Sequence, residues 1–161
     1  MADPTIPPLP EADPATRDAV LGWAERFAAR VRAVDYRGAV PFWHPEVLAF
    51  GTRESVVQGI APFRDRQWDG VWPRTADFGF TAKAARVLAS ADGTLAVLVA
   101  PFASTGFAED GTPFDRPGRA TIVLTRAGPG AEDAWVAVHS HLSLARGVPQ
   151  DSHGNRPVLA R

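Results

Sequence analysis

A ten-residue run near the end of the chain alternates in side-chain character with a period of two: Trp135-Val136-Ala137-Val138-His139-Ser140-His141-Leu142-Ser143-Leu144. Successive side chains of a β-strand point to opposite sides of the sheet, so the run predicts a strand with two different faces. The predicted faces are Ala137, His139, His141 and Ser143 on one side and Val138, Ser140, Leu142 and Leu144 on the other. Such a strand is typical of an antiparallel sheet that packs on a core on one side.

The segment before residue 75 has the periodicity of helices. Asp13 followed by Pro14 is a helix start, and the apolar residues after it recur at spacings of three and four: Val20, Trp23, Ala24, Phe27, Val31 and Val34. A short helical turn is predicted at 37–43, and a short strand at 47–50. A second helix is predicted from Ile60 to Trp72, with Pro73 as its stop.

The segment after residue 78 predicts strands joined by tight turns. The predicted strands cover 80–90, 94–106, 119–126 and 135–144, and the turns contain Asp92-Gly93, Asp110-Gly111 and Gly128-Pro129-Gly130. Helices followed by an antiparallel meander predict an α+β fold in which N-terminal helices cover one face of a curved, cone-shaped sheet. A cone of this kind leaves room for a pocket between the helices and the sheet.

Composition restricts the function classes. The chain has 161 residues, is 45% hydrophobic and has a formal net charge of -1, which predicts one globular domain and gives no basic field for nucleic acid. No apolar run reaches the roughly 18 residues of a membrane span, no cysteine is present, and a signal-peptide pattern is missing at the start. We therefore expect a cytoplasmic protein that binds neither nucleic acid nor membrane. The predicted organisation is a flexible arm at 1–14, a domain at 15–146 and a tail at 147–161.

Three motifs carry a resemblance to a known family. They are Gly59-x-x-x-Phe63, Trp72-Pro73-Arg74 and the closing pattern Trp135-x-x-Val138-His139-x-His141-x-Ser143. Together with the element order, they resemble the SnoaL-like branch of the nuclear transport factor 2-like superfamily over residues 17–146. The closing pattern is also similar to that of the association domain of calcium/calmodulin-dependent kinases. Because this superfamily contains isomerases, cyclases, dehydratases and assembly domains, the resemblance predicts the fold more sharply than the function.

Two functions follow from this resemblance. The first is a pocket protein that binds a small apolar molecule, with isomerase, lyase or cyclase chemistry on an apolar or carbonyl-containing metabolite. The second is a non-catalytic association domain, and a homodimer through the sheet is expected in either case. Ketosteroid isomerisation is not expected, because the resemblance puts Phe27 at the family's tyrosine donor and Gly51 at its aspartate base. We expect no cofactor.

Aromatic residues supply the predicted pocket lining. The predicted lining residues are Phe27, Phe63, Trp68, Trp72, Phe102 and Ser140. The alternative for most of the aromatic members is an ordinary packed core. Trp72 differs from them, because it precedes a proline at a helix end, where the association domain that this chain resembles has a loop tryptophan near its pocket mouth. For Trp72, the resemblance therefore makes a rim position and a core position equal alternatives.

Four polar residues are further candidates. His139 and His141 share a predicted strand face about 6.5 to 7 Å apart, a spacing that suits an acid/base pair or two metal ligands. A metal needs at least one more ligand, and no spacing in the sequence supplies it, so we expect no metal and favour the outer sheet face for both histidines. Asp115 and Arg119 are candidates for the pocket mouth, with a turn-capping aspartate and a solvated arginine as the alternative.

Overall fold

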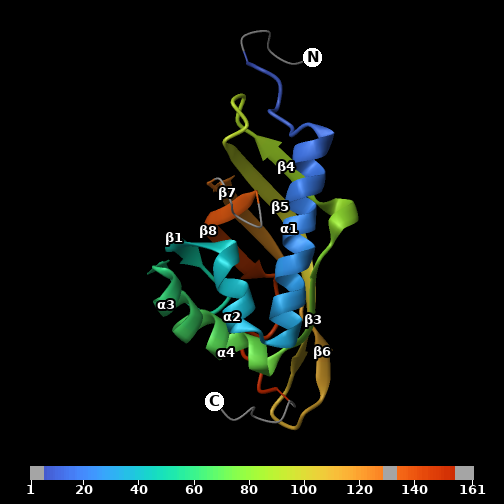
Figure 1. Ribbon diagram of the computed structural model, residues 1–161. Coiled ribbons are helices and arrows are strands. Elements are labelled where there is room, and N and C mark those ends of the chain that lie inside the picture. Colours follow the sequence, from blue (N-terminus) through green and yellow to red (C-terminus); the bar gives the residue numbers. More distant parts are fainter. Residues whose placement is uncertain (1–5, 129–133, 155–161) are drawn as a thin grey trace.

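A curved sheet crossed by one long helix forms the body of the protein (Figure 1). This computed structural model describes residues 6–128 and 134–154. The strands that it describes are β1 (Trp43–Phe50), β2 (Val57–Gln58), β3 (Ala76–Phe80), β4 (Arg86–Ala89), β5 (Leu95–Phe107), β6 (Pro113–Asp115), β7 (Gly118–Arg126) and β8 (Trp135–Leu144). Helix α1 (Pro14–Ala33) lies lengthwise over one face, so the predicted α+β architecture is confirmed.

The strand order is β2-β1-β8-β7-β5-β3, with β4 and β6 also paired to β5. Strands β5, β7 and β8 pair antiparallel, as the predicted meander requires. Strand β1 pairs with β8 in parallel, which the turn pattern did not predict because the two strands are far apart in sequence. The prediction of one strand over 80–90 is wrong: a helical turn at Ala82–Ala84 separates β3 from β4, and both strands pair with β5.

Strand β8 has the predicted bounds but not the predicted faces throughout. Its pairing with β7 joins Leu124 to Ala137 and Val123 to His139, so Val138 is the extra residue of a β-bulge. A bulge puts one additional residue in one strand and thereby reverses the alternation beyond it. Ala137 is consequently buried on the core face, and the prediction that it shares a face with His139 is wrong.

Helix α1 has the ends that its sequence predicts. The Asp13 carboxylate accepts hydrogen bonds from the backbone N–H and the hydroxyl of Thr16, at 3.0 and 2.8 Å. These bonds lower the pKa of Asp13 from its ordinary value, because they stabilise the charged form. The helix ends at Val34, whose φ of 53° is left-handed. Between these ends, residues such as Trp23 and Phe27 face the core.

The helical segments after α1 are short and irregular. Before β1 the chain forms α2 (Tyr36–Ala39) and a turn at Val40–Phe42. After β2, in place of one regular second helix, it forms α3 (Ile60–Pro62), a six-residue π-helical segment at Phe63–Trp68, α4 (Asp69–Val71) and a final turn at Trp72–Arg74. The π-helical geometry places Phe63, Gln67 and Trp68 together on the buried side. This irregular segment is what brings an amide side chain into an otherwise aromatic layer.

Both ends of the described chain contact the body. Near the N-terminus, Ala12 N–H donates to Val87 O and Ala89 N–H donates to Pro10 O, each at 2.9 Å. Near the C-terminus, the Ser152 hydroxyl donates to Arg74 O and accepts from Phe107 N–H. The division into arm, domain and tail remains a prediction, and parts of the arm, of the tail and of the turn at Gly128-Pro129-Gly130 lie outside the described residues.

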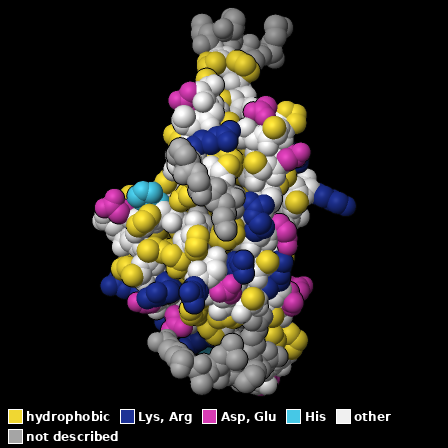
Figure 2. All heavy atoms as spheres, in the orientation of Figure 1, with side chains coloured by type: hydrophobic (Ala, Val, Ile, Leu, Met, Phe, Trp, Pro, Cys, Tyr) yellow, Lys and Arg dark blue, Asp and Glu magenta, His cyan; other side chains and the backbone are white. Residues whose placement is uncertain are grey.

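The surface carries charges of both signs. On the face shown in Figure 2, basic and acidic side chains are interspersed, without a large field of one sign. In the described part of the chain, no helix has the length and apolarity needed to cross a membrane.

Candidate functional site

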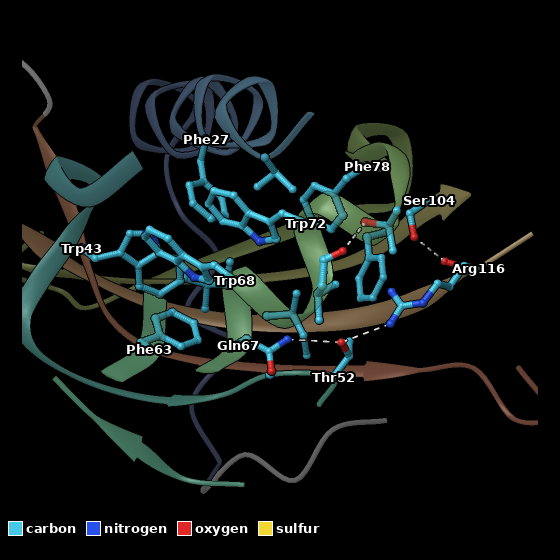
Figure 3. Close-up of a pocket in the computed structure, with 17 residues that line it drawn as sticks. Phe27, Trp43, Thr52, Phe63, Gln67, Trp68, Trp72, Phe78, Ser104 and Arg116 are labelled. Atoms are coloured by element: carbon cyan, nitrogen blue, oxygen red, sulfur yellow. Dashed lines mark hydrogen bonds between the residues drawn. The ribbon is translucent and has the colours of Figure 1, made fainter. Parts of the chain in front are cut away.

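A small apolar pocket lies between the helices and the inner face of the sheet (Figure 3). Its volume is about 50 Å³. The residues that line it are Phe27, Val31, Trp43, Gly51, Thr52, Phe63, Gln67, Trp68, Val71, Trp72, Thr75, Phe78, Phe102, Ser104, Arg116, Ile122 and Leu142. The lining therefore combines α1, the irregular helical region, and strands β1, β3, β5, β7 and β8.

The aromatic side chains of this pocket contact one another closely. The Trp68 and Trp72 rings are stacked, with centroids 4.4 Å apart, and the Phe27 ring meets Trp72 edge-on at 5.9 Å. Trp43 and Phe63 make a further edge-to-face contact at 5.1 Å. Trp72 is 6% exposed and belongs to this buried layer, which favours the core alternative for its ring. The stacked layer leaves little free volume, which explains the small size of the pocket.

One charged side chain reaches this apolar layer. Arg116, which follows β6, is 4% exposed, and its guanidinium points toward Thr52 (Figure 3). Its Nη2 donates to the Thr52 hydroxyl at 3.3 Å, and its Nε has no hydrogen-bond partner among the described residues. Burial lowers the pKa of Arg116 from its ordinary value, yet an arginine remains protonated at neutral pH. Within the described chain, no carboxylate forms an ion pair with it.

Gln67 holds the polar end of the pocket in place. Its carbonyl oxygen accepts from the backbone N–H groups of Arg53 and Glu54, at 3.1 and 3.0 Å, and its amide donates to the Thr52 hydroxyl at 3.3 Å. Thr52 thereby joins the amide of Gln67 to the guanidinium of Arg116. Gly51 lies directly under Gln67, and a Cβ added there would be 2.0 Å from the Gln67 side chain. The space that a carboxylate at position 51 would need is therefore filled by an amide.

A second, polar pocket continues from the first. It shares Thr52, Val71, Thr75 and Arg116 with the apolar pocket and has a volume of about 240 Å³. Its remaining lining residues are Arg53, Gly70, Gln150, Asp151 and Ser152. Arg116 therefore lies at the junction between the small apolar pocket and the larger polar pocket.

The structure places five of the predicted lining residues around the apolar pocket and one, Ser140, outside it. Phe27, Phe63, Trp68, Trp72 and Phe102 all surround the apolar pocket, and their contact with a ligand stays a prediction. Ser140 is fully buried on the same sheet face but does not line the pocket, because its hydroxyl faces the Phe50 carbonyl, 3.4 Å away. Leu142, two residues farther along β8, reaches the pocket in its place.

The two predicted histidines lie together on the opposite, outer face of the sheet. The Nδ1–H of His139 donates to Leu48 O at 2.8 Å, since a carbonyl oxygen can only accept. The Phe50 ring lies near both imidazoles, with centroid distances of 5.9 Å to His139 and 5.2 Å to His141. No third metal-ligating side chain joins them within residues 6–128 and 134–154.

Asp115 and Arg119 are also outside the pocket. Asp115 is exposed opposite Thr105, and the Arg119 Nε donates to the Ser143 hydroxyl at 3.1 Å on the outer face. Arg116 lies between these two residues in the sequence, and it is the functional candidate that the sequence analysis missed. Its backbone N–H donates to Ser104 O, which puts it beside a buried position of β5. Buried and exposed residues alternate along β5. This alternation would have identified Arg116 as a buried residue if the register of β6 with β5 had been known.

The arrangement suits recognition of a negatively polarised oxygen. Arg116 offers a protonated guanidinium, while Thr52, Ser104 and Gln67 offer neutral polar groups. Among the described residues that line the apolar pocket, no side chain accepts a proton near neutral pH. The site can hold and stabilise an oxyanion or carbonyl oxygen, as buried donors do in other pockets.

Comparisons with known proteins agree with this fold. The family model described as SnoaL-like domain matches residues 17–147. Among curated proteins, none matches the sequence.

Solved structures show the same architecture at low identity. A nuclear transport factor 2-like superfamily protein from Salmonella enterica is 17% identical, with a TM-score of 0.68, and the match covers 85% of this chain and 96% of that one. The CaMKII hub of S. rosetta is 20% identical, with a TM-score of 0.63 and coverage of 87% and 100%. A ketosteroid isomerase-like protein from Erwinia carotovora is 10% identical, with a TM-score of 0.66 and coverage of 82% and 98%. At these identities the likeness shows the fold alone.

Proposed function

The chain belongs to the family of SnoaL-like domains, and on that premise we propose that it binds a small apolar or carbonyl-containing metabolite in the apolar pocket. The observation that carries this proposal is the position of Arg116, a buried guanidinium at the edge of an aromatic pocket. Burying a charge without a partner costs free energy, so an arginine in this place needs a compensating role. Binding the oxygen of a ligand is such a role.

The residues that line the apolar pocket also determine which reactions it could support. Isomerase, lyase and cyclase reactions at a carbonyl develop negative charge on its oxygen, and the guanidinium of Arg116 would stabilise that charge. A proton acceptor would have to come from the substrate or from water, because none of the described pocket residues supplies one. We therefore propose ligand binding as the function and electrophilic assistance as the catalytic contribution of Arg116.

A neutral probe tests this proposal. We expect 2-hexanone to raise the melting temperature of the purified protein, because a ligand that binds the folded state stabilises it. The substitution Val71→Phe adds volume where the two pockets meet and is expected to abolish the shift. As a control, Val56→Phe changes the same residue type at an exposed position and should leave the shift intact. No shift with the wild-type protein, together with no co-purified small molecule in a mass spectrum, would refute the proposal.

A second proposal concerns the outer face of the sheet, where we propose that two copies of the chain form a homodimer. Four large apolar side chains in the described strands of this sheet are exposed: Leu48 at 47%, Phe50 at 38%, Leu95 at 43% and Val99 at 43%. The helices cover the inner face, so burial of these side chains requires a partner. Association in this way is the alternative function that the fold supports.

Sedimentation velocity tests the dimer. We expect a species of twice 17.2 kDa at micromolar concentration. The substitution Phe50→Asp should convert it to the monomer, because a carboxylate would be buried in the contact. The matched substitution Val56→Asp, at another exposed apolar position, should leave the dimer unchanged. A wild-type protein that sediments as a monomer would remove this proposal without affecting the pocket.

A further inference from the structure

Four buried side-chain donors in the described chain have no hydrogen-bond partner, and two of them belong to residues of the apolar pocket. They are the indole N–H of Trp43 and the Nε–H of Arg116. Buried polar groups in folded proteins are nearly always paired, so each orphan needs an explanation. For Arg116 the deficit is larger than one hydrogen bond, because its positive charge also has no carboxylate partner among the described residues.

We propose that Arg116 binds the carboxylate of a small aliphatic acid whose apolar end enters the apolar pocket. This inference rests on the proposed function and names the class of ligand. A guanidinium presents several N–H donors in a planar fork, a geometry that matches the two oxygens of a carboxylate. The orphan Nε of Arg116 and its weakly bonded Nη2 both belong to that fork.

The charges around both pockets favour an anion with a single charge. Arg116 is the ionisable residue of the apolar pocket, and the polar pocket adds Arg53 and Asp151. Arg53 has an ion-pair partner of its own, since its Nε lies 3.8 Å from the Glu54 carboxylate. Arg116 is therefore the cation available to a ligand at the junction, and one carboxylate matches its single charge. A phosphate dianion would add a second negative charge to a site that already contains Asp151.

The two volumes determine how such an acid is oriented. The apolar pocket, at about 50 Å³, holds a few heavy atoms, while the polar pocket, at about 240 Å³, is larger. Arg116 lines both, so a carboxylate at the junction directs a slim alkyl chain toward the aromatic rings. A chain also suits the site better than a bulky ring system, which would have to separate the stacked Trp68 and Trp72.

Three probes of equal chain length test the charge requirement in the wild-type protein. Hexanoate has the carboxylate, hexanamide has the same shape without the charge, and hexylamine reverses the charge. Because hydrogen bonds to charged groups are stronger than neutral ones, hexanoate should bind roughly tenfold to a hundredfold more tightly than hexanamide. Hexylamine should not bind. Dissociation constants from calorimetry or tryptophan fluorescence measure the difference.

Variants of Arg116 assign the effect to its side chain. Arg116→Met keeps a buried unbranched stem and removes the charge, so hexanoate should lose the advantage over hexanamide. Arg116→Lys keeps the charge without the planar fork and should give an intermediate affinity. Arg119→Met makes the same change at an exposed position on the outer face and should leave the hexanoate affinity unchanged.

Stability gives a second readout that separates a ligand-binding arginine from a structural one. An unpaired buried charge destabilises the folded state, so Arg116→Met is expected to melt at or above the wild-type temperature without ligand. Hexanoate should raise the melting temperature of the wild type and not that of the variant. A structural role would give the reverse, a variant that melts well below the wild type.

The outcomes separate this inference from the proposed function. Equal affinity for hexanoate and hexanamide in the wild type, or unchanged hexanoate affinity in Arg116→Met, overturns the carboxylate site even if 2-hexanone binds. Failure of every probe, 2-hexanone included, overturns both proposals. If Arg116→Met does not fold, the structural role is established and the inference is likewise overturned.

Discussion

The two faces of the sheet differ in how their polar groups are satisfied. On the outer face, His139 and Arg119 have hydrogen-bond partners, and apolar side chains such as Leu48 and Phe50 are exposed. On the inner face the apolar groups are packed, and one of the buried donors without a partner among the described residues is charged, the Nε–H of Arg116. The comparison shows that the unpaired charge lies at Arg116 and not at the histidines that stand out in the sequence. An unpaired charge in an apolar pocket points to a ligand more strongly than a pair of imidazoles on the outer face.

The largest expected difference between the faces is in stability. Trp68→Ala removes a fully buried ring and should lower the free energy of unfolding by about 3 to 5 kcal/mol, because transfer and cavity terms are lost together. Phe50→Ala removes a partly exposed ring of the outer face and should cost about 1 kcal/mol or less in the monomer. Urea denaturation at low protein concentration measures both. Equal losses would mean that the outer face is packed in solution as well.

The second expected effect concerns Gly51. Gly51→Asp places a side chain where Gln67 lies 2.0 Å from an ideal Cβ, so displacement of the amide should cost about 1 to 3 kcal/mol. Gly128→Asp introduces the same residue where no atom of the described residues lies within 4 Å of the added Cβ, and it should be close to neutral. Thermal melts of the two variants give the comparison. A neutral Gly51→Asp would show that Gln67 moves freely and that the polar end of the pocket is not rigid.

The same position predicts the activity of the wild-type protein toward ketosteroids. Without a carboxylate at position 51, no turnover of an unsaturated 3-ketosteroid is expected, since loss of a general base typically costs two to four orders of magnitude. A spectrophotometric isomerase assay measures this. Turnover at a rate typical of enzymes would show that another residue supplies the base and would contradict the pocket chemistry derived above.

The smallest expected effects are those of the outer-face histidines. His141→Ala changes an exposed side chain and should alter stability by less than about 0.5 kcal/mol. His139→Ala also removes the hydrogen bond to Leu48 O and should cost about 1 kcal/mol. Neither change should affect hexanoate binding, because both rings lie on the opposite face from Arg116. Loss of binding in either variant would connect the two faces and break the contrast between them.

Much of the fold could be predicted because its signals are local. The start of α1 follows from Asp13 and Pro14, and the bounds of β8 follow from the alternation around His139. The split between β3 and β4 was not predicted, since Thr81 to Ala85 lie inside the predicted strand over 80–90. The position of Trp72 could not be decided from the sequence, because the proline after it ends the regular helix but does not show that the ring stacks on Trp68.

The aromatic residues of the candidate site could be predicted from residue type, whereas its charged residue, Arg116, could not. Large aromatic residues on predicted helices and strands are buried in most folds, so the lining by Phe27, Phe63 and Trp68 was accessible from their spacing. Arg116 was not, because arginine is usually exposed and its neighbours Asp115 and Arg119 indeed are. Whether Asp115 or Arg116 points inward depends on the pairing of β6 with β5.

The sequence by itself determined the element types and the SnoaL-like family, since periodicity, caps and motifs act over a few residues. The tertiary structure alone decided which side of the sheet each group faces. A one-residue bulge at Val138 reverses the alternation of β8, and the register of β6 with β5 turns Arg116 inward while leaving Asp115 outside. Such choices are made by hydrogen bonds between strands far apart in the chain, and a one-residue shift is invisible in either strand's own sequence. The site depends on these shifts, because they put an unpaired guanidinium, and not an imidazole, against the aromatic pocket.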